Sequence, residues 1–511
     1  MTAKIPLLKV RQWVNTWDQS DWTDHLPKPE DHFFMGSVSL SELRKLAGVS
    51  RRRVEERAMK DAPAGYQRGH DRDRSDKIAR YIQYGYPASS TRGDVPLTTP
   101  DLIHPGWLPT AILVNILKPG DVRYRGGVAV ELARNAAINV VETDGLYHLE
   151  LPSVASTDIE PLEIIDGQHR VFSADGLDSL LSDYDVPVVF FSGLTTSWQA
   201  YLFWVINVEP KKINPSLAFD LYPELRNQLW LDRGEGLKIY QEHRAQELTE
   251  ALWRHAKSPW KGRIELLGNR VEGHVSNAAF IRSLIATFIR RWGSDHKVGG
   301  LFGAVDKAGD ERILRWNRSQ QAAFLIQIWS DVAAAAKGSQ NEWAVACREA
   351  YALLPDAARQ RTNPEGLDAA FAGPHSLLGT DQGVRAILHV FNAMFQVRYD
   401  EIGLDSWVLD DVESLMTDDG VSHALDSLKK HTRITQYSAT LARELTWTGF
   451  DWRTSTGPGL TSDQKPLQAS YRGSSGYTAL FGNVIEHLTK ADNREISETA
   501  ASVQQMTGRS K

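Results

Sequence analysis

The sequence predicts an α+β protein, with an α/β core in its N-terminal part and a mostly α-helical C-terminal half. Between residues 108 and 193, short β-branched runs such as INVVETDGLYHLEL and VPVVFF alternate with Gly, Pro and Asp-Gly turns, which is typical of strands. After Leu194, apolar residues recur at helical spacing, as in NAAFIRSLIATFIRRW and GVRAILHVFNAMFQVRY. These two patterns place the sheet before most of the helices along the chain.

The length and composition limit the class of protein. A chain of 511 residues is long enough for about two or three domains. We expect a lead-in and helical segment over residues 1–60, an α/β domain over 61–235 and a helical domain over 236–511. The net charge of −6 excludes a wholly basic nucleic-acid binder, so any contact with nucleic acid requires a local basic patch. A single cysteine excludes an internal disulfide, and no apolar run is long enough to predict a membrane span, so we expect a cytoplasmic protein without membrane contact.

The first elements are predicted from local patterns. Residues 1–35 are rich in Trp, Asp and Pro without a clear period, so we expect an irregular segment that docks through Trp13, Trp17 and Trp22. The stretch SLSELRKLAGVSRRRVEER then predicts two short helices with a break at Gly48. Such a pair resembles a helix-turn-helix whose second helix presents Arg51, Arg52 and Arg53 to DNA, although a solvated basic helix face explains the same pattern.

Two later segments also carry local signals. The stretch GYQRGHDRDRSDKIARYIQYG, residues 65–85, predicts a turn that leads into a helix. Residues 452–476 are rich in Gly, Ser, Thr and Pro and predict a long functional or mobile loop before the helix YTALFGNVIEHLTK. The backbone amides at the start of that helix could form an anion nest, with Arg472 adding charge, and a plain loop ending at a helix explains the pattern equally well.

The stretch EIIDGQHRVFSADGL, residues 163–177, has the strongest chemical signal. Its isoleucines end a strand, Gly167 allows a tight turn, and Gln168 begins a helix, whose N-terminus is a natural seat for phosphate. There Arg170 can supply a bidentate fork and His169 a second donor, while Asp166 can hold a metal ion or orient water. A structural alternative is that Asp166 caps the helix and the two basic residues pair with surface acids. No nucleophile elbow accompanies the stretch, which argues against a Ser-His-Asp hydrolase.

Three segments in order resemble the DGQHR-domain family, which includes the DndB proteins associated with DNA phosphorothioation and relatives in 7-deazaguanine DNA-modification systems. That family in turn resembles the ParB/sulfiredoxin superfamily of α/β nucleotide-binding domains. Besides the DGQHR stretch itself, the segments are QR…R…IA.Y, with Gln67, Arg68, Arg74, Ile78 and Tyr81, and FWVINVEPKKINPSL, with Asn207, Lys211, Lys212 and Ser216.

The resemblance implies a ParB/sulfiredoxin-like core that binds and hydrolyses ATP or another nucleoside triphosphate with Mg²⁺, in support of a DNA-modification or phage-defence system. The implied partners are DNA and other proteins of that system, and homo-oligomerisation stays open. No metal site of the protein's own is expected. The implied site residues are Asp166, His169 and Arg170 for catalysis; Gln67, Arg68, Gly167, Gln168, Asn207 and Lys211 for the nucleotide; and Arg51, Arg52, Arg53 and Lys212 for DNA.

The sequence departs from the sulfiredoxin-like pattern at one position, and two alternative functions compete with nucleotide hydrolysis. Sulfiredoxin-like relatives carry a catalytic cysteine where this chain has Gln168, and Cys347 lies far along the chain, which excludes thiol repair chemistry. The alternative function is a DNA-binding repressor or scaffold protein without nucleotide turnover. A ParB-type nuclease is the least supported function, because Asp166 alone gives only part of a metal site.

Overall fold

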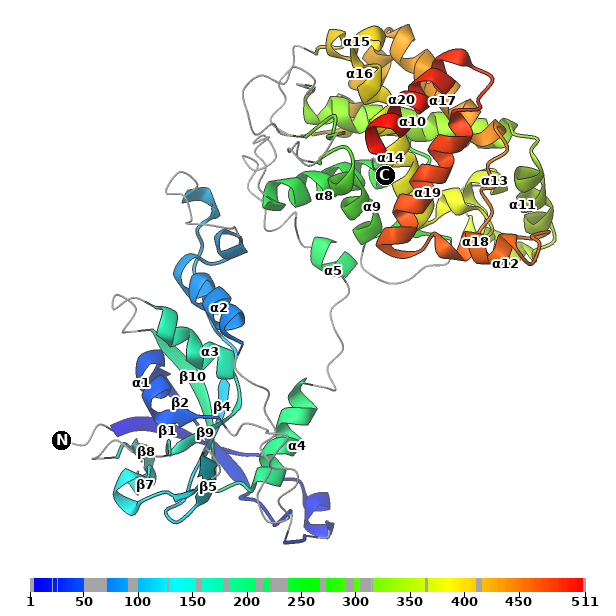
Figure 1. Cartoon of the computed structure of the whole chain (residues 1–511). Helices are drawn as coiled ribbons and strands as arrows, with labels where there is room; N and C mark the ends of the chain where they lie inside the picture. The colour runs from blue at the N-terminus through cyan, green and yellow to red at the C-terminus, as the bar shows by residue number, and fades with distance from the viewer. Residues whose placement is uncertain are drawn as a thin grey trace. The chain divides into compact units, whose positions relative to one another are not determined.

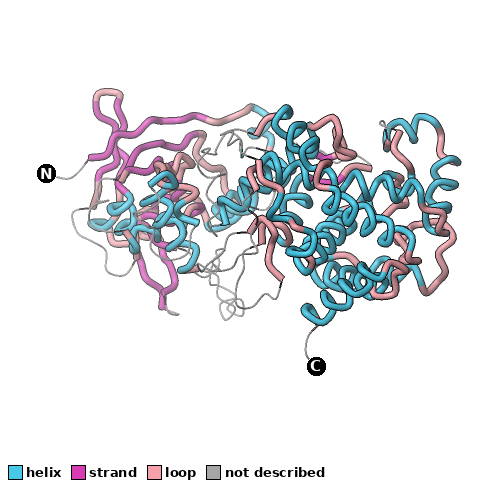
Figure 2. Tube along the Cα trace, turned by 90° about the horizontal axis from the view of Figure 1, so that it is seen from above, coloured by secondary structure: helices cyan, strands magenta, loops and turns pink. Residues whose placement is uncertain are grey.

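The computed structural model of the chain divides into two compact units, Met1–Lys212 and Ile213–Lys511 (Figure 1). Strands gather in the first unit, and the second unit is almost entirely helical (Figure 2). The structure describes residues 4–20, 22–24, 26–49, 71–90, 100–125, 128–152, 159–177, 184–207, 215–220, 222, 238–266, 273–290, 298–303, 314, 316–363, 366–409 and 416–508. The α+β class with a helical C-terminal half is confirmed.

The first unit is built on a mixed eight-stranded sheet with the order β3-β9-β4-β10-β2-β1-β8-β7. Pairs β4–β10 and β3–β9 are parallel, and the other neighbours in the sheet are antiparallel. Its strands are β1 (Lys4–Arg11), β2 (His32–Ser39), β3 (Ala47–Gly48), β4 (Ile112–Ile116), β7 (Asn139–Thr143), β8 (Leu146–Glu150), β9 (Leu162–Asp166) and β10 (Asp185–Ser192). A separate hairpin joins β5 (Val122–Arg125) and β6 (Val128–Glu131).

Two local predictions of this unit are confirmed. The Asp-Gly turn joins β7 to β8, and both Asp144 (φ 53°) and Gly145 (φ 79°) have the positive φ that a tight hairpin turn requires. The side-chain oxygen of Ser39 accepts a hydrogen bond of 3.2 Å from the amide of Glu42, as expected of a helix cap. The second helix of the predicted helix-turn-helix, with Arg51, Arg52 and Arg53, lies outside the described residues.

The N-terminal segment differs from the prediction. We expected residues 1–35 to be irregular and residues 1–60 to stand apart, but β1 and β2 lie inside the main sheet. The buried positions of these two strands are few and widely spaced, namely Leu7, Phe34 and Val38. The alternation of apolar and polar residues that predicts a strand is therefore weak in this part of the sequence. Trp13 contacts Trp17 and Trp22 with ring centroids 5.3 and 6.1 Å apart. Trp22 also contacts Trp198, with centroids 6.3 Å apart, so one of the three tryptophans docks on a distant segment of the unit as expected.

Four described helices accompany the sheet of the first unit. α3 contacts both α1 and α2, and α4 contacts β9 (Figure 1). The core between these layers consists of buried aliphatic and aromatic side chains of the central strands, such as Val114, Ile164 and Phe190. The helices are α1 (Leu40–Leu46), α2 (Arg72–Tyr84), α3 (Gln168–Phe172) and α4 (Thr196–Asn207).

The second unit packs its helices around one large apolar core. The long helix α10 lies at its centre and contacts α8, α13, α16 and α17. The helices are α5 (Pro215–Asp220), α8 (Lys238–Arg254), α9 (Asn277–Ala286), α10 (Arg318–Gly338), α11 (Glu342–Ala352), α12 (Asp356–Thr362), α13 (Ala369–Ala372), α14 (Asp381–Val397), α15 (Tyr399–Ile402), α16 (Asp418–Leu428), α17 (Thr432–Trp447), α18 (Gln464–Ser470), α19 (Gly473–Leu488) and α20 (Arg494–Thr507). A short parallel pair, β11 (Ile264–Glu265) and β12 (Val275–Ser276), completes it.

The predicted long loop over residues 452–476 is wrong in part. Helix α18 occupies its middle and α19 begins at Gly473, so the irregular stretch is divided into shorter pieces. Gly476 lies where an added Cβ would be 2.4 Å from the backbone carbon of Tyr471, so this glycine permits a close approach rather than marking a loop. No described helix is long and apolar enough to cross a membrane.

Candidate functional site

The DGQHR residues form the turn between β9 and α3. Gly167 has φ +98°, which a residue with a side chain rarely adopts. A Cβ on Gly167 would also lie 3.0 Å from a guanidinium nitrogen of Arg170 and 3.2 Å from Ile112 Cγ1. Gly167 is therefore required both for the direction of the chain and for the space that Arg170 occupies.

The partly buried Arg170 side chain links the turn to the backbone before β4. Its Nη2 donates to Asp166 Oδ2 at 2.8 Å, while its Nη1 donates to the backbone carbonyls of Thr110 and Ala111. The Arg170 side chain is only 15 % exposed. Because these partners engage both terminal nitrogens, Arg170 positions Asp166 rather than offering a free fork to phosphate. The structural alternative for this stretch is present in part. Arg170 does pair with an acid, but Asp166 makes no capping hydrogen bond to α3.

Asn207 reaches the same turn from the end of α4. Its Nδ2 donates to Asp166 Oδ1 at 3.3 Å and to the carbonyl oxygen of Phe203 at 3.0 Å. Arg170 and Asn207 thus hold one oxygen each of the Asp166 carboxylate. Asn207 therefore lies beside the DGQHR stretch.

His169 joins the turn to α2. Its Nδ1 lies 3.5 Å from the hydroxyl of Ser75, and its Nε2 lies 3.3 Å from Nε2 of Gln168. These contacts suit the neutral tautomer in which Nδ1 carries the hydrogen and Nε2 accepts from the amide. The other amide atom, Gln168 Oε1, is buried and has no hydrogen-bond partner within the described part of the chain. A buried acceptor of this kind accepts a hydrogen bond from a donor other than the described residues, such as a water molecule or a ligand.

A buried polar network surrounds Glu163, which precedes Asp166 by three residues on β9. Arg123 donates two hydrogen bonds, of 2.9 and 2.8 Å, to the carboxylate of Glu163, and Gln199 donates a third of 2.9 Å. The side chains of Glu163 and Arg123 are 7 % and 17 % exposed. Sequence reasoning missed this network, although an acid inside the otherwise apolar strand LEIID was the available signal.

The helix that follows the turn is shorter than expected. α3 ends at Phe172 and gives way to a 3₁₀ turn over Ser173–Gly176. So short a helix has few aligned peptide dipoles, and the expected phosphate seat at its N-terminus is correspondingly weaker. The polar side chains around Asp166, rather than the helix itself, therefore define the candidate site.

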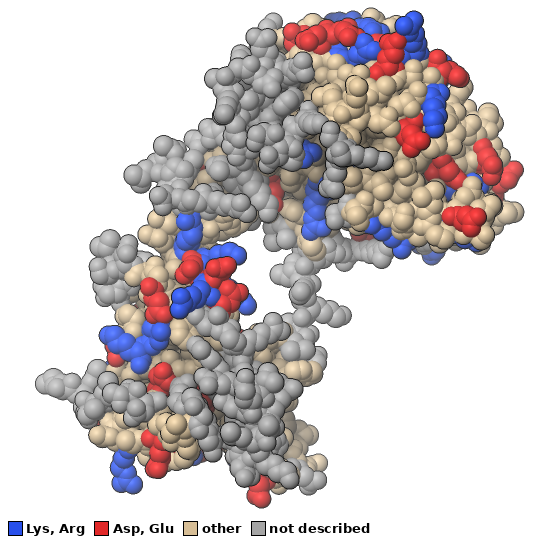
Figure 3. Space-filling view, in the orientation of Figure 1, with Lys and Arg blue, Asp and Glu red and all other residues tan. Residues whose placement is uncertain are grey.

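The other predicted site residues lie outside the described part of the chain. These are Gln67, Arg68 and Lys211, proposed for the nucleotide, and Arg51, Arg52, Arg53 and Lys212, proposed for DNA. On the described surface, acidic and basic side chains alternate along α2, so the visible face there carries no charge of a single sign (Figure 3).

At the turn after β9, the carboxylate of Asp166 is the group that would bind Mg²⁺. Within the described ranges, no group of three or more His, Cys, Asp or Glu side chains could hold a metal ion. Mg²⁺ in nucleotide sites is often held by one or two carboxylates together with the phosphates of the substrate. Asp166 fits that minimal role, because each of its oxygens keeps acceptor capacity beyond the hydrogen bond that it accepts from Arg170 or Asn207.

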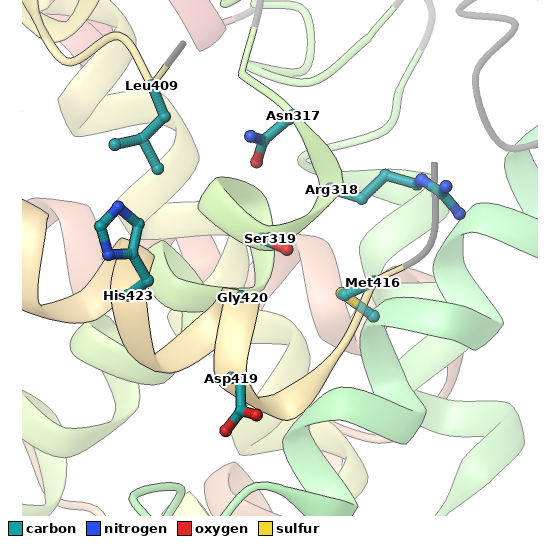
Figure 4. Close-up of a pocket in the computed structure, with 8 residues that line it drawn as sticks. All are labelled: Asn317, Arg318, Ser319, Leu409, Met416, Asp419, Gly420 and His423. Atoms are coloured by element: carbon teal, nitrogen blue, oxygen red, sulfur yellow. The ribbon is translucent and has the colours of Figure 1, made fainter. Parts of the chain in front are cut away.

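A hollow of about 240 Å³ lies in the second unit, between the starts of α10 and α16 (Figure 4). Leu409, Met416 and His423 are among the residues that line it. The Arg318 side chain points away from Leu409 and His423 (Figure 4). Its guanidinium pairs with Glu247 at 2.9 Å. Among the described residues that line this hollow, the one arginine is paired with a carboxylate, so the hollow is a weaker candidate for phosphate than the turn after β9.

Comparisons with known proteins do not assign the chain to a family. No family model, no curated protein and no solved structure matches it. The candidate site therefore stands on its own residues and on the resemblance of three sequence segments.

Substituting alanine for Gly167 should destabilise the first unit by about 1–3 kcal/mol, because the positive φ becomes strained and the new Cβ displaces Arg170 from Asp166. Gly145→Ala is the matched control, since Gly145 also has positive φ but an added Cβ meets nothing within 4 Å. Urea unfolding of both variants checks this. Equal losses of stability would show that the contact with Arg170 does not matter.

Proposed function

We propose that the chain is a nucleotide-binding protein with a ParB/sulfiredoxin-like core, which hydrolyses ATP or another nucleoside triphosphate in support of a DNA-modification or phage-defence system acting on DNA. One observation supports the proposal: a described residue from each of the two flanking segments lies beside the DGQHR turn at the end of β9. Ser75 of the first segment lies at His169, and Asn207 of the third donates to Asp166. Residues so far apart in sequence that converge on one polar turn are typical of a binding site.

Each residue of the turn has a distinct role in this proposal. Arg170 and Asn207 hold the Asp166 carboxylate in one orientation. Asp166 then accepts a hydrogen bond from the attacking water or contacts Mg²⁺. The Nδ1–H of His169, whose contact with the Ser75 hydroxyl is 3.5 Å long, donates to a phosphate oxygen. The bound nucleotide with Mg²⁺ supplies the phosphoanhydride bond that water cleaves.

The orphaned oxygen of Gln168 fits the same ligand. Gln168 Oε1 is a buried acceptor, so its partner must donate a hydrogen bond. A phosphate oxygen cannot do so, whereas a ribose hydroxyl or an amino group of the base can. The amide therefore supports a nucleotide, which carries both anionic and donor groups, over inorganic phosphate alone.

Phosphate release by the purified full-length protein tests the proposal, with ATP, CTP and GTP, each with Mg²⁺ and with or without duplex DNA. His169→Ala is the informative variant, because Arg170→Ala would also disturb the Asp166 turn. Removing a general acid or a phosphate donor is expected to lower turnover by about 10²–10⁴-fold. His104→Ala, which removes an exposed histidine of the same unit, should leave turnover unchanged.

Two results would contradict hydrolysis at this turn. One is full turnover by His169→Ala, and the other is no turnover with any of the three nucleotides. If the wild-type protein then shifted duplex DNA in a gel regardless of nucleotide, the alternative function, a DNA-binding repressor or scaffold protein, would take its place. Binding of that kind weakens as salt rises.

A further inference from the structure

Two exposed indoles of the first unit belong to segments that reach the turn after β9. Trp107 is 73 % exposed, the largest exposed fraction of any large apolar side chain described in this unit, and Trp204 is 50 % exposed. Neither residue has a role in the proposed hydrolysis. Single exposed aromatic residues are common in folded proteins, so what distinguishes these two is how each is held beside the turn.

The segment that bears Trp107 is fixed at the indole and again three residues later. Tyr81 Oη donates to the carbonyl oxygen of Trp107 at 3.1 Å. A Cβ on Gly106 would lie 1.8 Å from the carbonyl oxygen of Tyr81, so the segment packs directly on the last turn of α2. The carbonyl oxygen of Thr110 accepts a hydrogen bond from Arg170. The backbone that carries this indole is therefore anchored by the arginine of the turn.

Trp204 lies on α4, close to the other residue that holds the turn. It precedes Asn207 by three residues, so the two side chains are neighbours on the helix surface. Asn207 in turn donates to Asp166 Oδ1 at 3.3 Å. No residue of α4 is charged, and Tyr201, which comes three residues before Trp204, is also exposed. The end of α4 thus presents flat aromatic side chains next to the amide that binds the carboxylate of the turn.

The chemistry of these groups favours one class of ligand. An indole offers a large π-face, and nucleobases of every kind stack on such a face. In the same turn, the buried acceptor Gln168 Oε1 suits the ribose hydroxyl or the base amino group that a nucleotide carries. Inorganic phosphate offers neither a planar group nor these donors. The indoles and the polar turn together therefore fit a nucleotide unit.

We propose that Trp107 and Trp204 stack on a nucleobase whose phosphate lies at the turn after β9. The inference rests on the proposed function for the position of the phosphate, whereas the stacking itself requires no hydrolysis. Because every base has a π-face, the base belongs either to a free nucleotide or to a single strand of nucleic acid.

The test compares probes with and without a base, bound to the full-length chain. A non-hydrolysable ATP analogue and inorganic triphosphate, each with Mg²⁺, are measured by calorimetry. A short oligothymidylate and an abasic strand of the same length are measured by fluorescence anisotropy. Trp107→Ala and Trp204→Ala should each weaken binding of a base-bearing probe by about tenfold or more and leave binding of its base-free counterpart unchanged.

Three further variants serve as controls. Trp107→Phe and Trp204→Phe keep an aromatic ring and should recover much of the lost binding. Trp17→Ala removes an indole of the same unit that is 44 % exposed, but whose ring contacts Trp13. Trp17→Ala should bind every probe as the parent chain does.

The probes separate the two sources of the base. A loss with the ATP analogue alone assigns the site to a free nucleotide, and a loss with oligothymidylate alone assigns it to a single strand. A loss with both shows that either source occupies it.

The outcome is also distinct from that of the hydrolysis assay. Unchanged binding in both alanine variants, or equal losses for base-bearing and base-free probes, overturns the stacking site even where turnover depends on His169. No binding of any probe by the parent chain overturns it as well. A base-dependent loss of binding in a chain without turnover supports the stacking site and contradicts hydrolysis alone.

Discussion

Replacing Glu163 with alanine should lower the free energy of unfolding of the first unit by about 3–5 kcal/mol, because it leaves a buried charge without its partner. Arg123 is 17 % exposed and donates two hydrogen bonds to Glu163. Gln199, which is fully buried, loses its hydrogen bond to the same carboxylate. Urea unfolding, with hydrogen exchange of peptides from β4 and β9 as the local readout, measures the loss.

Two further variants separate this effect from the simple loss of an ion pair. Glu150→Ala breaks a pair with Lys4 whose side chains are 31 % and 48 % exposed, so it should cost less than about 1 kcal/mol. Arg123→Leu combined with Glu163→Leu removes both charges and should recover much of the lost stability. If the double variant were as unstable as Glu163→Ala, the buried charge would not be the cause.

Replacing Trp260 with alanine should destabilise the helical unit by about 3–5 kcal/mol. Trp260 is fully buried, and its ring contacts those of Phe280, Trp329 and Phe371 with centroids 4.9, 5.1 and 5.5 Å apart. The cavity left by the indole is surrounded by large rings that cannot all move inwards, so little of the lost contact is recovered.

The matched control for this core substitution is Trp447→Ala. Trp447 is 49 % exposed and donates one hydrogen bond of 3.2 Å to the carbonyl of Ala335, so its loss should cost at most about 1 kcal/mol. Hydrogen exchange in α10 distinguishes unfolding of this unit from unfolding of the sheet unit. Similar losses of unfolding free energy for both variants would mean that the aromatic cluster around Trp260 contributes no more to stability than the exposed Trp447.

Local patterns predicted much of the fold because they depend on neighbouring residues. The alternating strands around the Asp144-Gly145 turn, the cap at Ser39 and the periodic helices of the second unit are of this kind. The strands β1 and β2 were missed because few of their side chains are buried, and burial depends on partners elsewhere in the chain. Helix α18 was missed because the Gly, Ser and Pro residues in and around it are typical of a loop.

For the candidate site, the sequence by itself determined which residues stand together, namely an acid, a glycine, an amide, an imidazole and a guanidinium at the end of a strand. The need for Gly167 also follows locally, from the tight turn. Only the tertiary structure decided their roles, because hydrogen-bond partners come from distant segments. It turned Arg170 inwards onto Asp166 and two backbone carbonyls, brought Asn207 to the same carboxylate, and joined Arg123 to Glu163 beneath the turn.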